Sequence, residues 1–554
     1  MHKCIRRAIA LLLSVCIAAC PLSMAVWAAE EPLLLTVAAD THYQCAADLS
    51  EPSDKYTEYM LDKETFGYAS TQGQMPYESD VILRQMLSEF IASDSEYLLI
   101  AGDLTCGKRQ SHLAFAAHLR QAEQRSGKHI YVIIGNHDCY AQSDETHISM
   151  QEFREIYADF GYNEALVCDT DSASYAVDLN DRYRLLAIDS CIYGEDEGRI
   201  TQSVFRFIRG QVKRAAADGK ELIAMMHHSL LPHYALQPMI PSWRFYAGWF
   251  AANGIQTVLT GHIHANDIAS SVFAGKTIYD IQTGALISSP NTYRTLTLYP
   301  DKTQVESHFI TRIDTDLLPE YLTETQKAML QEDFASYAKA YFESGVCKWM
   351  NRNLGSVDRL VRWFKLKEGT TAYDAAQRLM TRLGAAVGQD IYDTGSGRSI
   401  EETLRRYAIP IEKSAYTKPY QIAAKIMYGF FHGDEDAIGN EADTRLLLRC
   451  VEGALLSAMQ SESDPTALDA LIGSVVENAA AMPPSVAMRQ CAEKTAFALV
   501  QTLADGFTED YSAPEDLQVV LTYNEKLHTT PLSLLVTIVR AVYTFFVRLI
   551  RSVW

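Results

Sequence analysis

Five short polar motifs recur along the chain, and their residues are types that bind divalent metal ions. Carboxylate and amide oxygens and imidazole nitrogens are the donors that borderline-hard divalent cations prefer. Of the 14 histidines after residue 29, 11 lie between His42 and His264, a concentration that chance does not explain. The motifs are Asp40-Thr41-His42, Gly102-Asp103, Gly135-Asn136-His137-Asp138, His227-His228 and Gly261-His262-Ile263-His264. Together they predict one hydrolytic site that holds two metal ions.

Each motif follows a short apolar run that is typical of a β-strand buried on both faces. The runs span residues 33–37, 97–100, 130–134, 222–226 and 257–259. Amphipathic segments at 79–93 and 111–126 predict helices between the first strands. Because strands and helices alternate, we expect α/β layers in which the motifs gather beyond the carboxyl ends of the strands.

This order of motifs resembles the calcineurin-like metallophosphoesterase superfamily, over roughly residues 30–312. The resemblance implies an α/β fold, a layered β-sandwich flanked by helices, and it also implies a role for each motif residue. Asp40, His42 and His264 would hold one metal, Asn136, His227 and His262 the other, and Asp103 would bridge both. His137 would stabilise the transferring phosphoryl group or protonate the leaving oxygen, oriented by Asp138. His228 would face the substrate.

Elementary electrostatics supports a bridged pair of metals. Two cations about 3.5–4 Å apart need a shared anionic ligand to offset their repulsion, and a water between them loses a proton near neutral pH. The resulting hydroxide would attack phosphorus in line while the cations neutralise the phosphoryl oxygens. We therefore expect a phosphate-ester hydrolase with two divalent ions. Mn, Fe and Zn all suit a mixture of His, Asp and Asn ligands.

The substrate class follows less directly, because the same ligands serve enzymes that cleave monoesters and diesters. Few basic residues flank the motifs: Lys108 and Arg109 follow Asp103, and His228, His233, Tyr43 and Tyr140 are the neutral neighbours expected near a substrate. We favour small phosphodiesters such as cyclic nucleotides. A phosphomonoesterase is the alternative, and a non-catalytic metal-holding protein at the cell surface is the alternative of another class. The presence of His137 argues against the latter.

Composition sets the remaining bounds. The chain has 554 residues, of which 48% are hydrophobic and 21% charged, so it is globular and longer than one ordinary domain. Its net charge of −20 disfavours nonspecific binding to a nucleic-acid polymer. A small phosphate ester is the partner that the sequence predicts, and the oligomeric state stays open.

Residues 1–29 have the features of an export signal, with an early basic segment, an apolar stretch and small residues before Glu30. We expect an extracytoplasmic protein, secreted or bound to the outer face of a membrane. Ile17-Ala18-Ala19-Cys20 also resembles a lipobox, and an uncleaved anchor is a third alternative. In an oxidising compartment, Cys45, Cys106, Cys139 and Cys191 would either form a disulfide among themselves or stay small buried thiols.

After Arg312 helical periodicity replaces the strand-like runs and continues to about Leu527. We predict an all-helical domain at 313–528, with helices at 325–344 and 372–387 and with Phe334, Tyr337 and Tyr341 in its core. Secreted bacterial members of the superfamily that resemble class III cyclic-nucleotide phosphodiesterases can carry such a domain. We predict that residues 529–554 form an amphipathic helix with a wide apolar arc and several arginines, which suits a membrane interface. Burial of that helix in the helical domain is the alternative.

Overall fold

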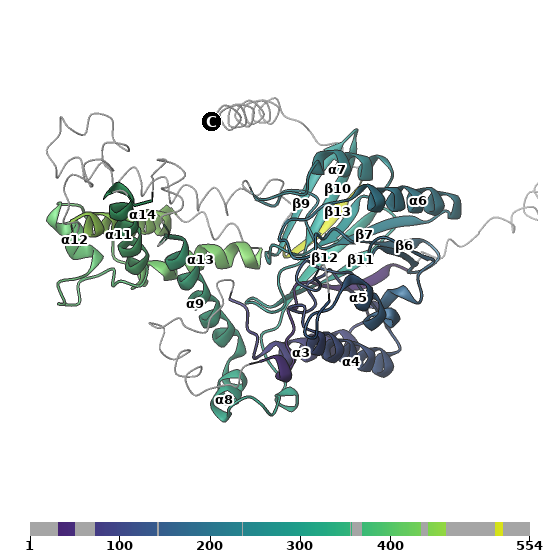
Figure 1. Cartoon of the computed structure of the whole chain (residues 1–554), viewed down its shortest axis with the longest axis horizontal. Helices are drawn as coiled ribbons and strands as arrows, with labels where there is room; N and C mark the ends of the chain where they lie inside the picture. Colours follow the sequence, from purple (N-terminus) through teal and green to yellow (C-terminus); the bar gives the residue numbers. More distant parts are fainter. Residues whose placement is uncertain are drawn as a thin grey trace, which may run out of the picture.

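The structure is a computed structural model that describes residues 31–49, 73–140, 143–234, 237–354, 356, 368–369, 371–433, 441–460 and 516–523. The predicted export signal (1–29) and the predicted C-terminal amphipathic helix (529–554) lie outside the described residues. Two β-sheets form the centre of the part of the chain that carries the motifs, and helices cover them (Figure 1).

The first sheet has the strand order β13-β12-β11-β1-β2-β3. Strands β1, β2 and β3 run parallel to one another, whereas β11, β12 and β13 are added antiparallel. The strands are β1 (Leu33–Ala38), β2 (Tyr97–Ile100), β3 (His129–Val132), β11 (Thr292–Leu298), β12 (Lys302–Phe309) and β13 (Gln518–Thr522). Three of the five predicted strands are therefore confirmed here.

The second sheet has the order β4-β5-β6-β7-β8-β10-β9. Its four neighbouring strands β6, β7, β8 and β10 run parallel to one another. The strands are β4 (Val167–Cys168), β5 (Tyr175–Asp178), β6 (Tyr183–Ile188), β7 (Glu221–Met226), β8 (Thr257–Thr260), β9 (Asp267–Phe273) and β10 (Lys276–Gln282). The strands predicted at 222–226 and 257–259 are β7 and β8, so these predictions are also confirmed.

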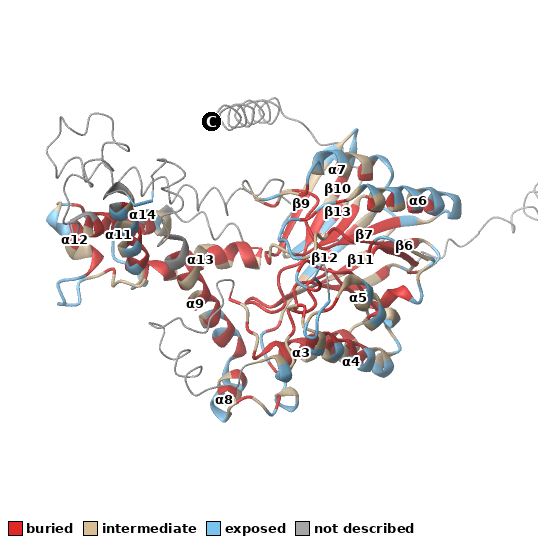
Figure 2. Ribbon diagram, in the orientation of Figure 1, coloured by how far each residue is buried: buried red, intermediate tan, exposed pale blue. Residues whose placement is uncertain are grey.

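Alternation along the strands places the two sheets face to face. On β7, Ile223 and Met225 join the core between the sheets, whereas Leu222, Ala224 and Met226 face the helices on the other side. This period of two is what a strand buried on both faces requires. The α/β sandwich with flanking helices that the sequence predicted is therefore present, and Figure 2 shows its buried interior.

Helices cover both sheets. The helices in the part of the chain that carries the motifs are α3 (Ser79–Ala92), α4 (Arg109–Ser126), α5 (Met150–Ile156), α6 (Gln202–Asp218) and α7 (Trp243–Ala252). Short helical turns lie at η1 (Ala46–Asp48), η2 (Ala158–Tyr162) and η3 (Thr315–Leu317). Helix α6 begins at Thr201, whose hydroxyl accepts the Val204 N–H, and ends at Gly219 in the left-handed region.

The region after 312 is mostly helical where it is described. It contains α8 (Glu324–Glu332), α9 (Phe334–Leu354), α11 (Thr371–Ala386), α12 (Ile400–Arg406), α13 (Pro419–His432) and α14 (Glu441–Gln460). The single helix predicted at 325–344 is wrong in one respect, because it breaks at Asp333. That carboxylate accepts the Ser336 N–H at 3.0 Å and so caps a new helix, α9. Phe334, Tyr337 and Tyr341 are buried, as predicted, but they belong to the core around the sheets and not to the core of the helical region.

Helical periodicity does not extend to residue 528. Residues Gln518–Thr522 form β13, which pairs antiparallel with β12 at the edge of the first sheet. The segment reads Gln-Val-Val-Leu-Thr, which favours a strand, and pairing with β12 satisfies its backbone. The chain therefore returns from the helical region and adds an edge strand to the first sheet.

The described cysteines carry free thiols, and no disulfide joins Cys45, Cys106, Cys139 and Cys191. Each of the three that are only partly buried contacts polar groups of its own surroundings. The Cys191 thiol lies 3.5 Å from the Ile134 carbonyl, Cys45 lies 3.5 Å from Asp48, and Cys106 lies 3.9 Å from the His42 ring. The buried-thiol alternative thus fits these residues better. Among the described helices, none is long and apolar enough to cross a bilayer.

Candidate metal centre

The five motifs meet where the carboxyl ends of the two sheets adjoin. Backbone hydrogen bonds link the loops: Asp40 N–H donates to the Gly102 carbonyl at 3.1 Å, and Gly261 N–H donates to the His227 carbonyl at 3.0 Å. The first bond ties the loop after β1 to the loop after β2, and the second ties the loops after β7 and β8. Neighbouring parallel strands end at the same edge, so their ends deliver these side chains to one place.

Asp40, His42 and His264 form one group of donors, with ligand atoms within 4.8 Å of one another. The His42 Nε2 and His264 Nε2 atoms lie 3.2 Å apart, and Asp40 Oδ1 lies 3.4 Å from His264 Nε2. Two imidazole nitrogens and a carboxylate oxygen therefore point at one spot. This is the donor set that the resemblance assigned to the first metal.

The second group contains Asp103, Asn136, His227 and His262. His227 Nε2 lies 3.2 Å from Asp103 Oδ2 and 3.0 Å from Asn136 Oδ1, and His262 Nδ1 lies 3.1 Å from Asn136 Oδ1. Asp103 Oδ2 also lies 3.6 Å from His42 Nε2, so this carboxylate stands between the two groups. Asp40, Asp103 and His227 also have ligand atoms within 4.8 Å of one another.

The protonation states suit metal ligands. Burial lowers the pKa of His42 to about 3 and that of His262 to about 4, so both imidazoles are neutral and keep a free lone pair. Burial alone would raise the pKa of Asp103, but His227 and His42 outweigh it and hold that pKa well below its usual range. Burial opposes protonation of His227, and Asp103 outweighs it, raising its pKa to about 9. The imidazole of His227 is therefore protonated beside Asp103, and a bound divalent cation would replace that proton.

Backbone strain is concentrated at these residues. Asp40, His42, Asp103, His262 and His264 all have φ between +36° and +75°. Only four other non-glycine residues of the described chain lie at positive φ. Each such conformation costs roughly 1–3 kcal/mol and persists only where the surroundings enforce it. Strain gathered at five proposed ligands indicates that the fold holds their side chains in a fixed arrangement.

Two motif glycines are required by close approach. A Cβ on Gly135 would lie 2.1 Å from the Asp103 backbone nitrogen and 2.2 Å from its Oδ1 atom. A Cβ on Gly261 would lie 2.5 Å from Asp40 Oδ2 and 2.7 Å from the Ala39 Cβ. In both cases the glycine lets a carboxylate approach the backbone of a neighbouring ligand loop.

His137 lies at the site without joining either donor group. Its backbone N–H donates to Asp103 Oδ1 at 2.8 Å, its side chain is exposed, and its ring centroid lies 5.2 Å from that of His42. The amide thus orients the central carboxylate, and the exposed ring is available to a bound ester.

Asp138 does not orient His137 in the way the sequence suggested. Its two carboxylate oxygens accept the backbone N–H groups of Thr105 and Gly135, at 2.9 and 2.8 Å. Burial, together with the nearby Asp103, raises its pKa to about 8. Asp138 therefore joins the loop that carries Asp103 to the loop that carries Asn136, and acts on the site through the backbone.

The His227-His228 pair is divided as predicted, with His227 at the donor groups. Its Nδ1 atom lies 2.8 Å from the Ala101 carbonyl, which leaves Nε2 for the site. His228 is buried, its Nδ1 lies 2.9 Å from the Ser190 hydroxyl, and its ring centroid lies 4.4 Å from that of His262. The structure thus places His228 against a proposed ligand rather than on an open face.

Two further residues that were expected near the substrate are buried in polar networks. The Tyr43 hydroxyl donates to Asp80 at 3.2 Å, and His233 Nδ1 lies 2.7 Å from Asp267. Tyr140 is exposed, with a relative exposure of 42%. Its ring packs 4.4 Å from that of His147.

His112 is a supporting residue that the motifs did not reveal. It is buried, with Nε2 lying 2.8 Å from the Thr105 hydroxyl and 2.9 Å from the Asp138 carbonyl. Its Nδ1 atom lies 2.8 Å from the Tyr157 hydroxyl. Its place beside Phe115 and Ala116 on the apolar side of α4 was the only sequence signal for this role.

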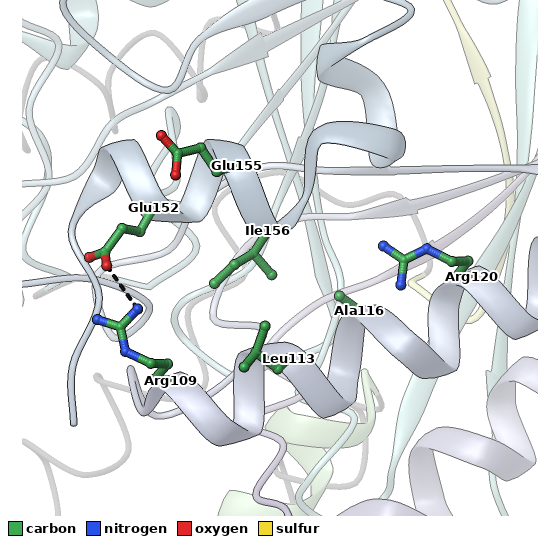
Figure 3. A pocket seen from close by; sticks show the side chains of 7 residues that line it. All are labelled: Arg109, Leu113, Ala116, Arg120, Glu152, Glu155 and Ile156. Carbon is green, nitrogen blue, oxygen red and sulfur yellow. Dashed lines mark hydrogen bonds and ion pairs between the residues drawn. The ribbon is translucent and has the colours of Figure 1, made fainter. Parts of the chain in front are cut away.

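A hollow of about 390 Å³ on the surface between α4 and α5 is separate from the donor groups. Figure 3 shows Arg109 and Glu152 paired at one side of it, beside apolar side chains such as Leu113. The two charged groups lie 2.8 Å apart. None of the residues lining it is one of the proposed metal ligands, so the hollow is not the reaction site.

The C-terminal part of the chain braces the Gly261–His264 loop. Helix α13 ends there: Asn266 donates from its side-chain amide to the His432 carbonyl at 3.3 Å, and Ala265 is buried in the helical core. A Cβ on Gly433 would lie 2.6 Å from the Asn266 carbonyl oxygen, so helix and loop are in close contact.

Asp516, just before β13, completes this brace. Its Oδ1 atom accepts the Ile268 N–H at 2.7 Å, and its carbonyl accepts the buried Arg294 guanidinium at 2.6 Å. Arg294 also donates to the Gln282 carbonyl, and the Gln282 side-chain amide donates to the Ala265 carbonyl at 2.9 Å. Asp516 lies 248 positions after Ile268 in the sequence and thus helps, from a distant segment, to fix the loop that carries His262 and His264.

The fold and the donors define the class of this part of the chain: an α/β sandwich with two adjoining groups of metal ligands. Residues 33–266 match the family described as calcineurin-like phosphoesterase, and they form a domain of that family. The chain is 25% identical over 198 residues to a protein of Psychrobacter arcticus described as a probable cyclic nucleotide phosphodiesterase. That match covers 34% of this chain and 63% of the relative, which is less than two thirds of its length.

Solved structures with a similar chain path include a dimetal phosphatase from Danio rerio. It is 13% identical, the match covers 50% of this chain and 97% of that one, and the TM-score is 0.38. A purple acid phosphatase from yellow lupin is 11% identical, with 50% and 52% covered and a TM-score of 0.32.

We predict that His137→Ala retains the metal-binding capacity of the protein but lowers the rate of ester hydrolysis by roughly 10²–10⁴. Alanine keeps the amide that donates to Asp103 and removes only the exposed ring. Elemental analysis and steady-state rates test this together, with His129→Ala at the remote start of β3 as the matched control. Loss of metal in the His137 variant would place its ring among the ligands instead.

We predict that Asp516→Ala lowers the free energy of unfolding by about 1–3 kcal/mol, because the buried Ile268 N–H loses its acceptor. The variant should also bind metal more weakly, since the loop of His262 and His264 is less firmly held. Asp516→Asn keeps an acceptor oxygen and should restore metal binding. Denaturant titration and metal-binding isotherms measure both effects, and an alanine variant that matches the unaltered protein in both would contradict the bracing role.

Proposed function

We propose that the protein is an exported phosphoesterase that uses two divalent metal ions to hydrolyse small phosphodiesters, such as cyclic nucleotides. One observation carries the proposal: seven donor side chains from five loops converge, and the buried Asp103 carboxylate lies between His42 and His227. The calcineurin-like phosphoesterase domain supports a phosphoester hydrolase.

The ligand set fits two metals, because imidazole nitrogens and buried carboxylate oxygens of the two groups converge at separations of 3.2–3.6 Å. Asp40, His42 and His264 would hold one ion and Asn136, His227 and His262 the other, with Asp103 shared. When bound, the ions would activate water and neutralise charge on the phosphate. The exposed His137 ring would contact the leaving oxygen or a phosphoryl oxygen and supply a proton there.

A preference for diesters is supported by the interactions of the nearby cations, which are already engaged with other groups of the protein. A monoester carries one more anionic oxygen than a diester and calls for an additional positive group. Lys108 donates instead to the Asp48 carbonyl at 3.0 Å, and Arg109 is paired with Glu152 at 2.8 Å. The relative described as a probable cyclic nucleotide phosphodiesterase points the same way.

The leader-like residues 1–29 support an extracytoplasmic location, secreted or bound to the outer face of a membrane. A small phosphate ester is the proposed partner. The arginine-containing helix at 529–554 is proposed as a contact with the membrane interface.

We predict that metal-reconstituted protein hydrolyses bis-nitrophenyl phosphate with a higher kcat/KM than nitrophenyl phosphate at the same pH. The comparison isolates the second ester group, because the leaving group is identical. A tenfold preference for the monoester, about 1.4 kcal/mol of transition-state binding, would favour the phosphomonoesterase alternative. Metal binding without turnover of either ester would favour the non-catalytic alternative.

A further inference from the structure

The outer surface of the second sheet carries a cluster of aromatic side chains on α6 and α7. The Phe205 ring on α6 lies 5.7 Å from that of Phe245 and 5.0 Å from that of Trp249, both on α7. Phe245 has a relative exposure of 56%, and Trp249 is half-buried. Figure 1 shows the two helices close together at one end of the molecule, α6 over β6 and β7, and α7 over β9 and β10. Phe205 and Trp249 pack partly on the core beneath the two helices, whereas Phe245 is the exposed member of the cluster.

The same surface is basic, although the chain as a whole carries a net charge of −20. No ion pair engages its cations among the described residues, and the only carboxylate of α6, α7, β9 and β10 that is exposed, Asp218, is already bonded to Arg184. The exposed basic residues are Arg206, Arg209, Lys213 and Arg214 on α6, Arg244 on α7 and Lys276 on β10.

The aromatic and basic side chains are arranged together. At 100° per residue along α6, Arg206, Arg209 and Lys213 fall within about 60° of one another, on the solvent side next to Phe205. On α7, the Arg244 guanidinium lies 4.3 Å from the centre of the Trp243 ring. One exposed and several half-buried aromatic side chains, bordered by arginine and lysine, are typical of a surface that rests in a membrane interface.

The surface also begins beside the metal centre. Helix α6 starts shortly after Ser190, which contacts His228, and the Arg199 N–H donates to the Ser190 carbonyl at 2.7 Å. Helix α7 follows the loop that leaves His227. Both helices therefore run away from the edge of the sheet at which the donors gather, with their first turns closest to it.

We propose that this aromatic-basic face, formed by α6 and α7 with Lys276, docks onto an anionic phospholipid bilayer. Phe245 and Trp249 enter the interfacial layer, and Arg206, Arg209, Lys213 and Arg244 contact lipid phosphates. The anionic bilayer repels the rest of this acidic chain. The aromatic-basic face therefore sets one orientation and holds the metal centre near the lipid headgroups. A nucleic-acid duplex would use the cations but would leave the exposed Phe245 without a partner, because its bases are already stacked.

The test is flotation of the full chain with vesicles of phosphatidylcholine, with and without phosphatidylglycerol. We expect binding only to the anionic vesicles, and a loss of roughly 100-fold in partitioning for the triple variant Arg206→Glu, Arg209→Glu and Lys213→Glu. The matched control changes three exposed cations of the helical region by the same charge, Arg398→Glu, Arg405→Glu and Lys413→Glu, and should bind like the unaltered protein. Equal binding by both triple variants would overturn the proposal.

A second measurement reports on the face itself, whatever other segments of the chain touch lipid. Because the segment 529–554 is itself proposed to contact lipid, Trp554→Phe serves as the common background. Vesicles of brominated phosphatidylglycerol quench tryptophans that enter the interface, and we expect most of this quenching to vanish when Trp243→Phe and Trp249→Phe are added to that background. Quenching that persists unchanged would place another tryptophan in the lipid and contradict the proposal. Loss of a dimer in Phe245→Asp, without any vesicle binding by the unaltered chain, would assign the face to a second copy instead.

Discussion

The structure depends on one buried carboxylate, that of Asp103, which must be held between two groups of imidazoles. Its Oδ1 atom accepts a hydrogen bond from the His137 backbone N–H, and its Oδ2 atom faces His227 on one side and His42 on the other. An anion taken out of water is costly unless charges and donors surround it closely, so every ligand loop must arrive at this point. The left-handed backbones and the motif glycines follow from that requirement, since they allow five chain segments to approach one another within ordinary contact distances.

The same requirement explains why the chain returns to its first sheet after the helical region. The loop of His262 and His264 follows β8, where the His262 N–H donates to Asp40, and the segment after the loop is supported from the C-terminal part of the chain. The end of α13 and Asp516 provide that support through Asn266 and Ile268. The helical region and the phosphoesterase domain thus share one structural purpose at this boundary, whatever else the helical region does.

Much of this arrangement could be predicted from the sequence. Short apolar runs before each motif identified the five central strands, because burial on both faces leaves a continuous apolar pattern that does not depend on distant residues. The pairing of β13 with β12 could not be predicted in this way, since it joins segments more than 200 residues apart. Asp138 illustrates the same limit: its spacing next to His137 suggested a side-chain contact, whereas its oxygens bind backbone amides that only the folded loops bring near. The break at Asp333 carried a local signal, a capping residue, that helical periodicity concealed.

Anomalous diffraction from crystals of the manganese-reconstituted protein tests the central claim most directly, because it locates the ions without reference to activity. The account predicts two peaks about 3.5–4 Å apart, with the Asp103 carboxylate between them. Asp40, His42 and His264 should surround one peak, and Asn136, His227 and His262 the other. A single peak, or two peaks that Asp103 does not join, would contradict the account.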